Sequence, residues 1–259
     1  MLLTGAASGV IAGLLGVGGG IVIVPMMEVA LTFVGVEPSV RMHVAVATSL
    51  AVIVPTSVSS ALAHHRKQAV DWRVVRTWSA FIFLGALTGI LISTYVSGRF
   101  LAGTFAVAAA LLAVNMIGRF GERRLGDELP VGAAIHSLPL GIGTLSTLMG
   151  IGGGSMTVPA LTMYGKPIHI AVGTSAVLGL VIALPAAGGY IFTGWHNPKL
   201  PEASLGYVSL IGFGLIAPAS VIFAPLGARI AHSISRRRLS MVFGIFLLAA
   251  AIRMGSQAI

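Results

Sequence analysis

Long runs of apolar residues dominate the chain and limit what it can fold into. Six runs are clear, at about 44–63, 77–97, 100–118, 169–193, 204–228 and 238–256. A helix that crosses a bilayer needs about 20 such residues. Of the 259 residues, 56% are hydrophobic and 9% are charged. Because the runs are continuous rather than alternating in the manner of a membrane β-barrel, the sequence predicts an all-α polytopic membrane protein.

Two longer apolar stretches, 1–34 and 131–164, each contain a glycine cluster. The segment LLGVGGGIVIVP (14–25) matches LMGIGGGSMTVP (148–159) with the same internal spacing. Further on, MHVAVATSL (42–50) matches IHIAVGTSA (168–176). Two motifs that recur in the same order predict an internal duplication, a common feature of transporters. We expect repeat 1 at 1–118 and repeat 2 at 131–256, joined by a polar linker at 119–130.

The distribution of basic residues favours a re-entrant helical hairpin at each glycine cluster. With one hairpin and three membrane-spanning helices per repeat, the second repeat is inverted. Twelve of the sixteen Lys and Arg residues then share one side, and four lie opposite: Arg41, Arg99, Lys199 and Arg253. Eight single crossings would divide them nine to seven. The positive-inside rule therefore predicts a cytoplasmic linker and both termini outside.

Glycine accepts the backbone angles of a tight turn and lets a ligand approach the main chain. The limb that leaves each turn, near Gly20 or Gly154, presents free N–H groups at a helix N-terminus, which attracts anions. In the inverted arrangement the two turns meet near the middle of the membrane, where secondary transporters bind their substrates. The alternative is that the glycines only allow close helix packing.

The second repeated motif supplies hydroxyl groups that can donate hydrogen bonds to an oxyanion: Thr48, Ser49, Thr174 and Ser175. Such side chains also commonly bond to their own helix backbone. Glu28 is the only acid inside an apolar segment, and an interfacial or structural role is favoured for it over a functional one. His43 and His169 correspond between the repeats and can titrate near neutral pH, but capping or an interfacial position explains them equally well.

The motifs resemble those of the sulfite exporter TauE/SafE family of membrane permeases. The resemblance rests on GLLGVGGGIVIVP, AVATS, GIGGGSMTVPAL and HIAVGTS, and it covers nearly the whole chain. It implies transport of small sulfur-containing or organic anions, such as sulfite, sulfonates or sulfoacetate, across the bacterial inner membrane. The site residues it suggests are Gly16, Gly18, Gly19, Gly20, Gly150, Gly152, Gly153 and Gly154, with Thr48, Ser49, Thr174 and Ser175. We add Ser155, which follows the second cluster.

The function expected from the sequence is secondary transport of a small anion by alternating access, without a cofactor or a bound metal. The expected partners are the anion and the lipid bilayer, with no nucleic acid; self-association is left open. A passive anion channel and a non-transporting membrane scaffold are the alternatives. A membrane enzyme is disfavoured, because the apolar runs hold no acid–base pair, metal cluster or nucleophile–histidine arrangement at a plausible spacing.

Overall fold

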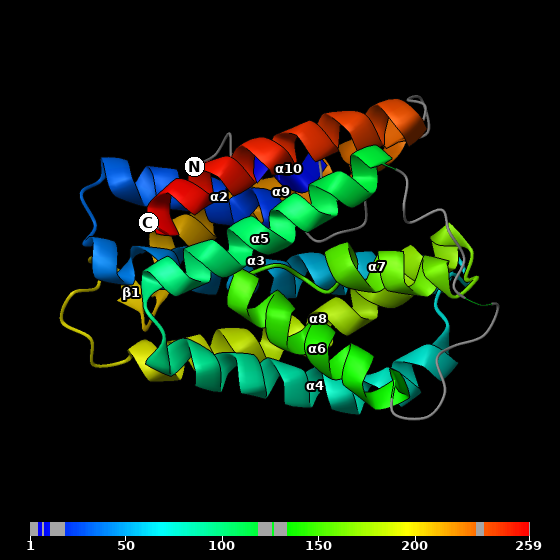
Figure 1. The fold of residues 1–259 in the computed structure, drawn as a ribbon, viewed down its shortest axis with the longest axis horizontal. Helices are drawn as coiled ribbons and strands as arrows, with labels where there is room; N and C mark the ends of the chain where they lie inside the picture. Colours follow the sequence, from blue (N-terminus) through cyan, green and yellow to red (C-terminus); the bar gives the residue numbers. More distant parts are fainter. Residues whose placement is uncertain are drawn as a thin grey trace.

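The computed structural model describes residues 5–6, 8–10, 19–118, 126, 134–231 and 236–258, and their side chains except at 134 and 224–240. Figure 1 shows the fold, which is helical as the sequence predicts. The helices are α2 (Gly20–Phe33), α3 (Pro38–Arg66), α4 (Trp72–Tyr95), α5 (Gly98–Gly118), α6 (Ala134–Met149), α7 (Gly154–Met163), α8 (Ile168–Gly194), α9 (Leu210–Ala231) and α10 (Arg236–Ala258). Two short strands, β1 (Ser204–Leu205) and β2 (Val208–Ser209), pair antiparallel.

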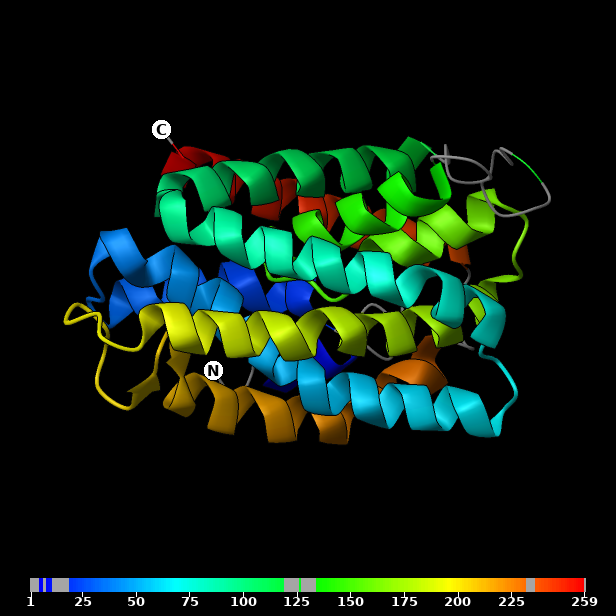
Figure 2. The ribbon, with the colours of Figure 1, turned by 90° about the horizontal axis from the view of Figure 1, so that it is seen from below.

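The helices run roughly along the long axis of the molecule, so the connections gather at two ends (Figures 1 and 2). We call one of these the left end, after its place in Figure 1. It holds residues 34–37, 96–97 and 195–209. The right end holds residues 67–71 and 164–167. This lengthwise arrangement is the one that apolar helices need if their ends are to reach the two surfaces of a bilayer.

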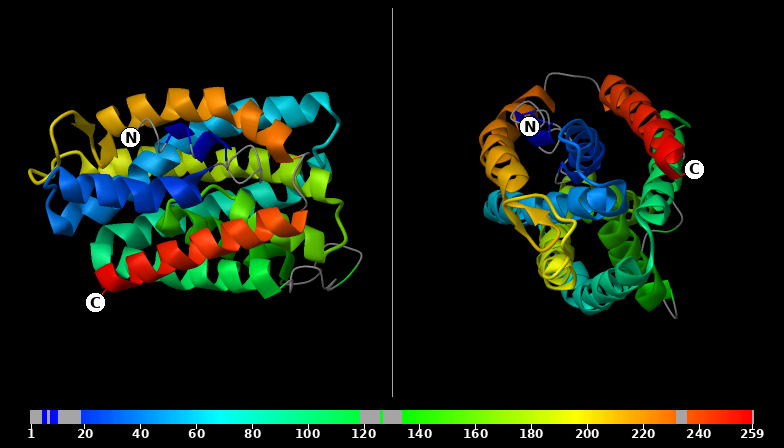
Figure 3. Two further views of the ribbon diagram at one scale, coloured as in Figure 1. Left: turned by 90° about the horizontal axis from the view of Figure 1, so that it is seen from above. Right: turned by 90° about the vertical axis from the view of Figure 1, so that its left-hand side faces the viewer.

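The central helices are α3 and α8, which pack against each other. In the most apolar stretch of α3, 67% of the residues are buried, and in α8 61% are, against 28–33% in α4, α5 and α10. Seen end-on in Figure 3, α9 lies on one side and α5 with α10 on the other, with α2 and α3 between them. The outer helices therefore offer apolar side chains to lipid, while α3 and α8 carry the interior.

Five of the described helices are long and apolar enough to cross a membrane: Pro38–Arg66, Trp72–Tyr95, Gly98–Gly118, Ile168–Gly194 and Met241–Ala258. They correspond to five of the six expected runs. The sixth, 204–228, begins differently, because residues 204–209 form the β1–β2 hairpin and α9 starts at Leu210. The turn between β1 and β2 contains Gly206, whose φ of 55° suits glycine. Gly206 packs against the backbone of Ile191 in α8. A count of apolar residues does not register this turn.

Glycines bring α6 and α4 into close contact. A Cβ at Gly85 of α4 would collide with the carbonyl oxygen of Leu140 in α6, and one at Gly143 of α6 would collide with that of Ile82. Small residues at such positions let helix backbones approach, as is common in membranes. Close packing therefore explains these glycines, and it fixes the position of α6.

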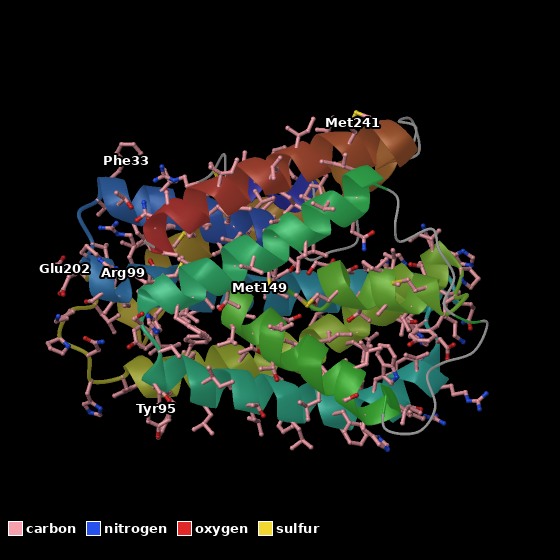
Figure 4. The ribbon with its side chains drawn as sticks, in the orientation of Figure 1. Phe33, Tyr95, Arg99, Met149, Glu202 and Met241 are labelled. Carbon is pink, nitrogen blue, oxygen red and sulfur yellow. The ribbon has the colours of Figure 1, made fainter. Side chains whose placement is uncertain are left out.

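The chain reverses direction after α6. This helix runs from the right end to the middle of the molecule, and α7 returns to the right end (Figure 1). Met149, the last residue of α6, lies near the middle of the long axis in Figure 4. In the other half, α2 starts at Gly20 and ends at Phe33 at the left end. Most of the expected first limb of the 1–34 hairpin, and all but residue 126 of the 119–130 linker, lie outside the described residues.

Candidate functional site

Two glycine turns form the centre of the candidate site. Gly19, just before α2, has a φ of 73°, and Gly150, just after α6, has a φ of 67°. These left-handed angles are costly for any residue with a Cβ. The helices that follow begin at Gly20 and Gly154, where the sequence predicts the second limbs to start.

The two turns touch each other inside the helix bundle. A Cβ at Gly20 would lie 2.7 Å from the carbonyl oxygen of Gly150 and 3.1 Å from the Cα of Ile151, so only glycine fits there. Ser49 of α3 joins the turns, because its hydroxyl donates to the Gly150 carbonyl at 2.7 Å and lies 3.5 Å from the carbonyl oxygen of Gly20. All of these residues are buried. Two segments about 130 residues apart in sequence thus share one contact.

The start of α7 gathers hydrogen-bonding groups that have no partner. The first N–H groups of any helix lack acceptors within it. Ser155 and Thr157 lie in the first turn of α7, and their buried hydroxyls make no hydrogen bond within the described part of the chain. The buried hydroxyl of Thr147 in α6 also lacks a partner there, but this side chain packs against Gly89 of α4. Such groups are costly to bury. An unpaired set beside a helix N-terminus is what an anion-binding site requires.

This helix start packs closely against α8. The position that a Cβ would take at Gly179 of α8 is 3.3 Å from the Oγ of Ser57 in α3 and 3.6 Å from the backbone nitrogen of Gly153. A Cβ at Gly153 would lie 3.0 Å from the end of the Ile182 side chain and 3.3 Å from the hydroxyl of Thr157. Glycine at 153 and 179 therefore keeps side-chain bulk away from the donors.

The predicted site residues divide into two groups. Gly19, Gly20, Ser49 and Gly150 come together at the contact between the turns. Gly152, Gly153, Gly154 and Ser155 follow directly at the second turn and are buried. Gly16 and Gly18 lie outside the described residues.

The two threonines of the second motif hold other elements in place. Thr48 of α3 accepts a hydrogen bond from the backbone N–H of Ser209 at 3.0 Å. Thr174 of α8 accepts one from the backbone N–H of Asp71 at 2.9 Å. Each threonine thus fixes the segment just before a helix in the other half of the chain. Ser175, by contrast, donates to the Val172 carbonyl of its own helix at 2.8 Å, as the alternative interpretation expects.

Thr147 and Thr157 were not identified from the sequence. Thr157 lies in GSMTVP, where the first cluster has the apolar GIVIVP. A comparison restricted to what the two clusters share overlooks such a residue. The available signal was a Ser-x-Thr pair in an otherwise apolar limb.

The ionisable residues singled out in the sequence lie away from the turns. Glu28 is buried, and its carboxylate lies 3.7 Å from Arg41 and 3.5 Å from Arg253, which fits a structural role. His43 is buried, whereas its counterpart His169 is exposed. No group of three or more His, Asp or Glu side chains that could hold a metal ion occurs among the described residues.

Each end of the molecule has an ion pair between the halves. At the left end, Lys199 lies 2.6 Å from Glu37, and at the right end Lys166 lies 2.6 Å from Asp71. Hydrogen bonds from Lys199 and Ser39 lower the pKa of Glu37. Burial raises the pKa of Asp71, but hydrogen bonds from Lys166 and the Val74 amide outweigh it, and the pKa is lowered. Both carboxylates are therefore charged at neutral pH.

Comparisons with known proteins identify the family of the chain. The family model described as Sulfite exporter TauE/SafE matches residues 1–254. A probable membrane transporter protein of Haemophilus influenzae is 34% identical, over 98% of this chain and 96% of its own length. Probable membrane transporter proteins of Methanocaldococcus jannaschii and Bacillus subtilis (YunE) are each 27% identical over 96% of this chain, and over 94% and 93% of their own lengths. No solved structure gives a significant match. The chain is therefore a multi-pass membrane protein that belongs to the TauE/SafE family of membrane transporters.

Proposed function

We propose that this protein is a secondary transporter of a small anion, a sulfur oxyanion or organosulfonate such as sulfite or sulfoacetate. The family description, sulfite exporter, supports this choice of substrate class. The observation that carries the proposal is the contact between the glycine turns, with unpaired donors beside it. The anion binds there, held by the N–H groups at the start of α7 and by the hydroxyls of Ser155 and Thr157.

The chemistry of these donors suits a small oxyanion. Several hydrogen bonds must replace the hydration shell of an anion that leaves water, or the cost of burial is prohibitive. The positive end of a helix stabilises the charge without placing a fixed cation in the membrane. Neutral hydroxyls add donors and leave the anion free to dissociate, which transport requires.

The movement we propose is a rocking of two inverted repeats, 1–118 and 131–256, around the turns. Two observations support a mechanical link between the halves: Thr48 bonds to Ser209, and Thr174 bonds to Asp71. Among the described side chains, five Lys or Arg residues lie at or near the right end: Arg66, Lys67, Arg73, Arg76 and Lys166. By the positive-inside rule, this cluster supports a cytoplasmic position for the right end in a bacterial cell.

Uptake into proteoliposomes tests the function. Vesicles that contain the protein should accumulate labelled sulfite or sulfoacetate faster than protein-free vesicles, and should discriminate against taurine and simple carboxylates. Unlabelled substrate inside the vesicles should accelerate uptake, because a carrier returns faster when loaded. Uptake equal to that of empty vesicles would contradict the proposal. Uptake that never saturates and shows no such acceleration would indicate a channel instead.

A further inference from the structure

A cleft lies at the left end, apart from the glycine turns. It has a volume of about 730 Å³ and is lined by the first residues of α3 and α5, the ends of α4 and α10, and the connection between α8 and α9. None of the predicted site residues that the structure describes lines it. The cleft is large enough for a small oxyanion with part of its hydration shell.

The lining carries more positive than negative charge. Its cations are Arg41, Arg99 and Lys199, and its one carboxylate is Glu28. Arg41 is paired with Glu28, and Lys199 with Glu37. Arg99 is exposed and makes no ion pair or hydrogen bond within the described residues. Figure 4 shows Arg99 at the left end, where α5 begins. Its guanidinium group is thus available to a ligand.

Backbone donors lie next to this arginine. Helix α5 starts at Gly98, so Gly98 and Arg99 belong to its first turn, and both line the cleft. Ser97 caps this end, since its hydroxyl accepts from the amide of Phe100 and its carbonyl accepts from that of Leu101. The remaining N–H groups of this turn are those of Gly98 and Arg99, two residues that line the same cleft as the free guanidinium group, at the positive end of the helix.

A buried histidine, His43, forms part of the wall of the cleft. It lines the cleft, is only 6% exposed, and its Nδ1 has no hydrogen-bond partner in the described chain. Its Nε2 lies 3.2 Å from the carbonyl oxygen of Ser93. A carbonyl can only accept, so Nε2 is the donor in this bond and Nδ1 of the neutral ring presents a lone pair. The Nδ1 atom itself is covered by the protein, so His43 contributes a polar group behind the wall of the cleft and no direct contact with a ligand.

We infer that this cleft is an outer binding site for small oxyanions, in which Arg99 and the N-terminus of α5 hold the anion at the left end. The inference rests on the proposed function, since it takes the captured anion to be the transported one. The site then concentrates substrate at the mouth of the pathway. Because Arg99 makes no ion pair or hydrogen bond within the described residues, its guanidinium group can bind the anion without breaking another contact.

Isothermal titration of the purified protein with sodium sulfite tests the inference directly. We expect Arg99→Gln to weaken binding about tenfold or more, as the loss of charge-assisted hydrogen bonds predicts. Arg99→Lys keeps the charge but loses the fork of donors, so its affinity for sulfite should lie between those of wild type and Arg99→Gln. The control is Arg76→Gln, which removes an equally exposed charge near the right end and should leave binding within twofold of wild type.

The outcomes separate this site from the glycine turns. Gly153→Ala should keep the Arg99-dependent binding, because it alters only the second turn. If Arg99→Gln binds sulfite as wild type does, or if wild type binds none, the inference is overturned. Arg99-dependent binding without any uptake into vesicles would keep this site and defeat the proposed function. Uptake by wild type with no Arg99-dependent binding would keep the proposed function and overturn this site.

Discussion

The two halves of the chain carry the same glycine motif but surround it with different side chains. In both halves a helix starts after the glycines, at Gly20 and at Gly154. The first helix continues with the buried apolar residues Ile21 and Ile23, whereas the second continues with the buried hydroxyls of Ser155 and Thr157. Both helices begin at an equivalent glycine, although the glycine before it is left-handed in the first half (Gly19, φ 73°) and right-handed in the second (Gly153, φ −51°). The donors that we propose for anion binding are concentrated at the second turn.

The second motif shows the same contrast. Thr48 and Thr174 behave alike, because each accepts a hydrogen bond from a backbone N–H in the other half. The adjacent serines differ, since Ser49 bonds across to Gly150 while Ser175 bonds within its own helix. Equivalent sequence positions thus share backbone roles more closely than side-chain partners.

The largest expected effect comes from adding side-chain bulk at the second turn. A methyl group at Gly153 would lie 3.0 Å from the flexible end of Ile182 and 3.3 Å from the hydroxyl of Thr157. We expect Gly153→Ala to lower sulfite uptake at least tenfold and to cost about 1 kcal/mol of stability or less, as substitutions at helix caps do. Gly141→Ala in α6 has open space around it and should keep full uptake. Equal uptake by the two variants would place the site elsewhere.

The two serines should differ in stability. Ser49→Ala leaves the buried carbonyl of Gly150 without its hydroxyl partner, which should lower the free energy of unfolding by about 2 kcal/mol. Ser175→Ala removes only a hydrogen bond within its own helix and should change the free energy of unfolding by about 0.5 kcal/mol or less. Thermal unfolding in detergent measures both. Similar losses would mean that the two serines have equivalent partners.

The two threonines should be more alike. Thr48→Val leaves the N–H of buried Ser209 without an acceptor, at a cost of about 1.5 kcal/mol. Thr174→Val removes the acceptor of the Asp71 N–H. Asp71 is partly exposed, so water can replace the hydroxyl, and the free energy of unfolding should fall by about 1 kcal/mol. A larger loss at Thr174 than at Thr48 would contradict this ranking by burial.

The smallest effect concerns the ion pairs at the two ends. The pKa of Asp71 is lowered in the folded chain. Its pairing with Lys166 therefore stabilises the fold at neutral pH, and this contribution is lost as the pH falls below about 4. The loss should be about 1 kcal/mol or less. Asp71→Asn should flatten the acid limb of the stability curve. Glu37→Gln at the more exposed pair should change the acid limb less, and the opposite order would refute the assignment.

The sequence predicts the helical membrane fold, confirmed here, and the starts of α2 and α7 at Gly20 and Gly154. Glycine clusters and apolar runs are local signals, which is why they can be recognised without a structure. The partners of Thr48 and Glu28 could not be predicted, because Ser209 and Arg253 are 161 and 225 residues away in sequence. The β1–β2 hairpin was missed because its residues continue an apolar run. Repeat symmetry, orientation and the roles of the site residues stay predictions.

Thr157→Val is the sharpest test of an anion site at the second turn, because it removes one unpaired hydroxyl and keeps the shape of the side chain. We expect at least a tenfold loss of sulfite uptake. We also expect a melting temperature equal to or above that of wild type, since the buried hydroxyl has no partner to lose. Full uptake by a stably folded Thr157→Val protein would contradict an anion site at the start of α7.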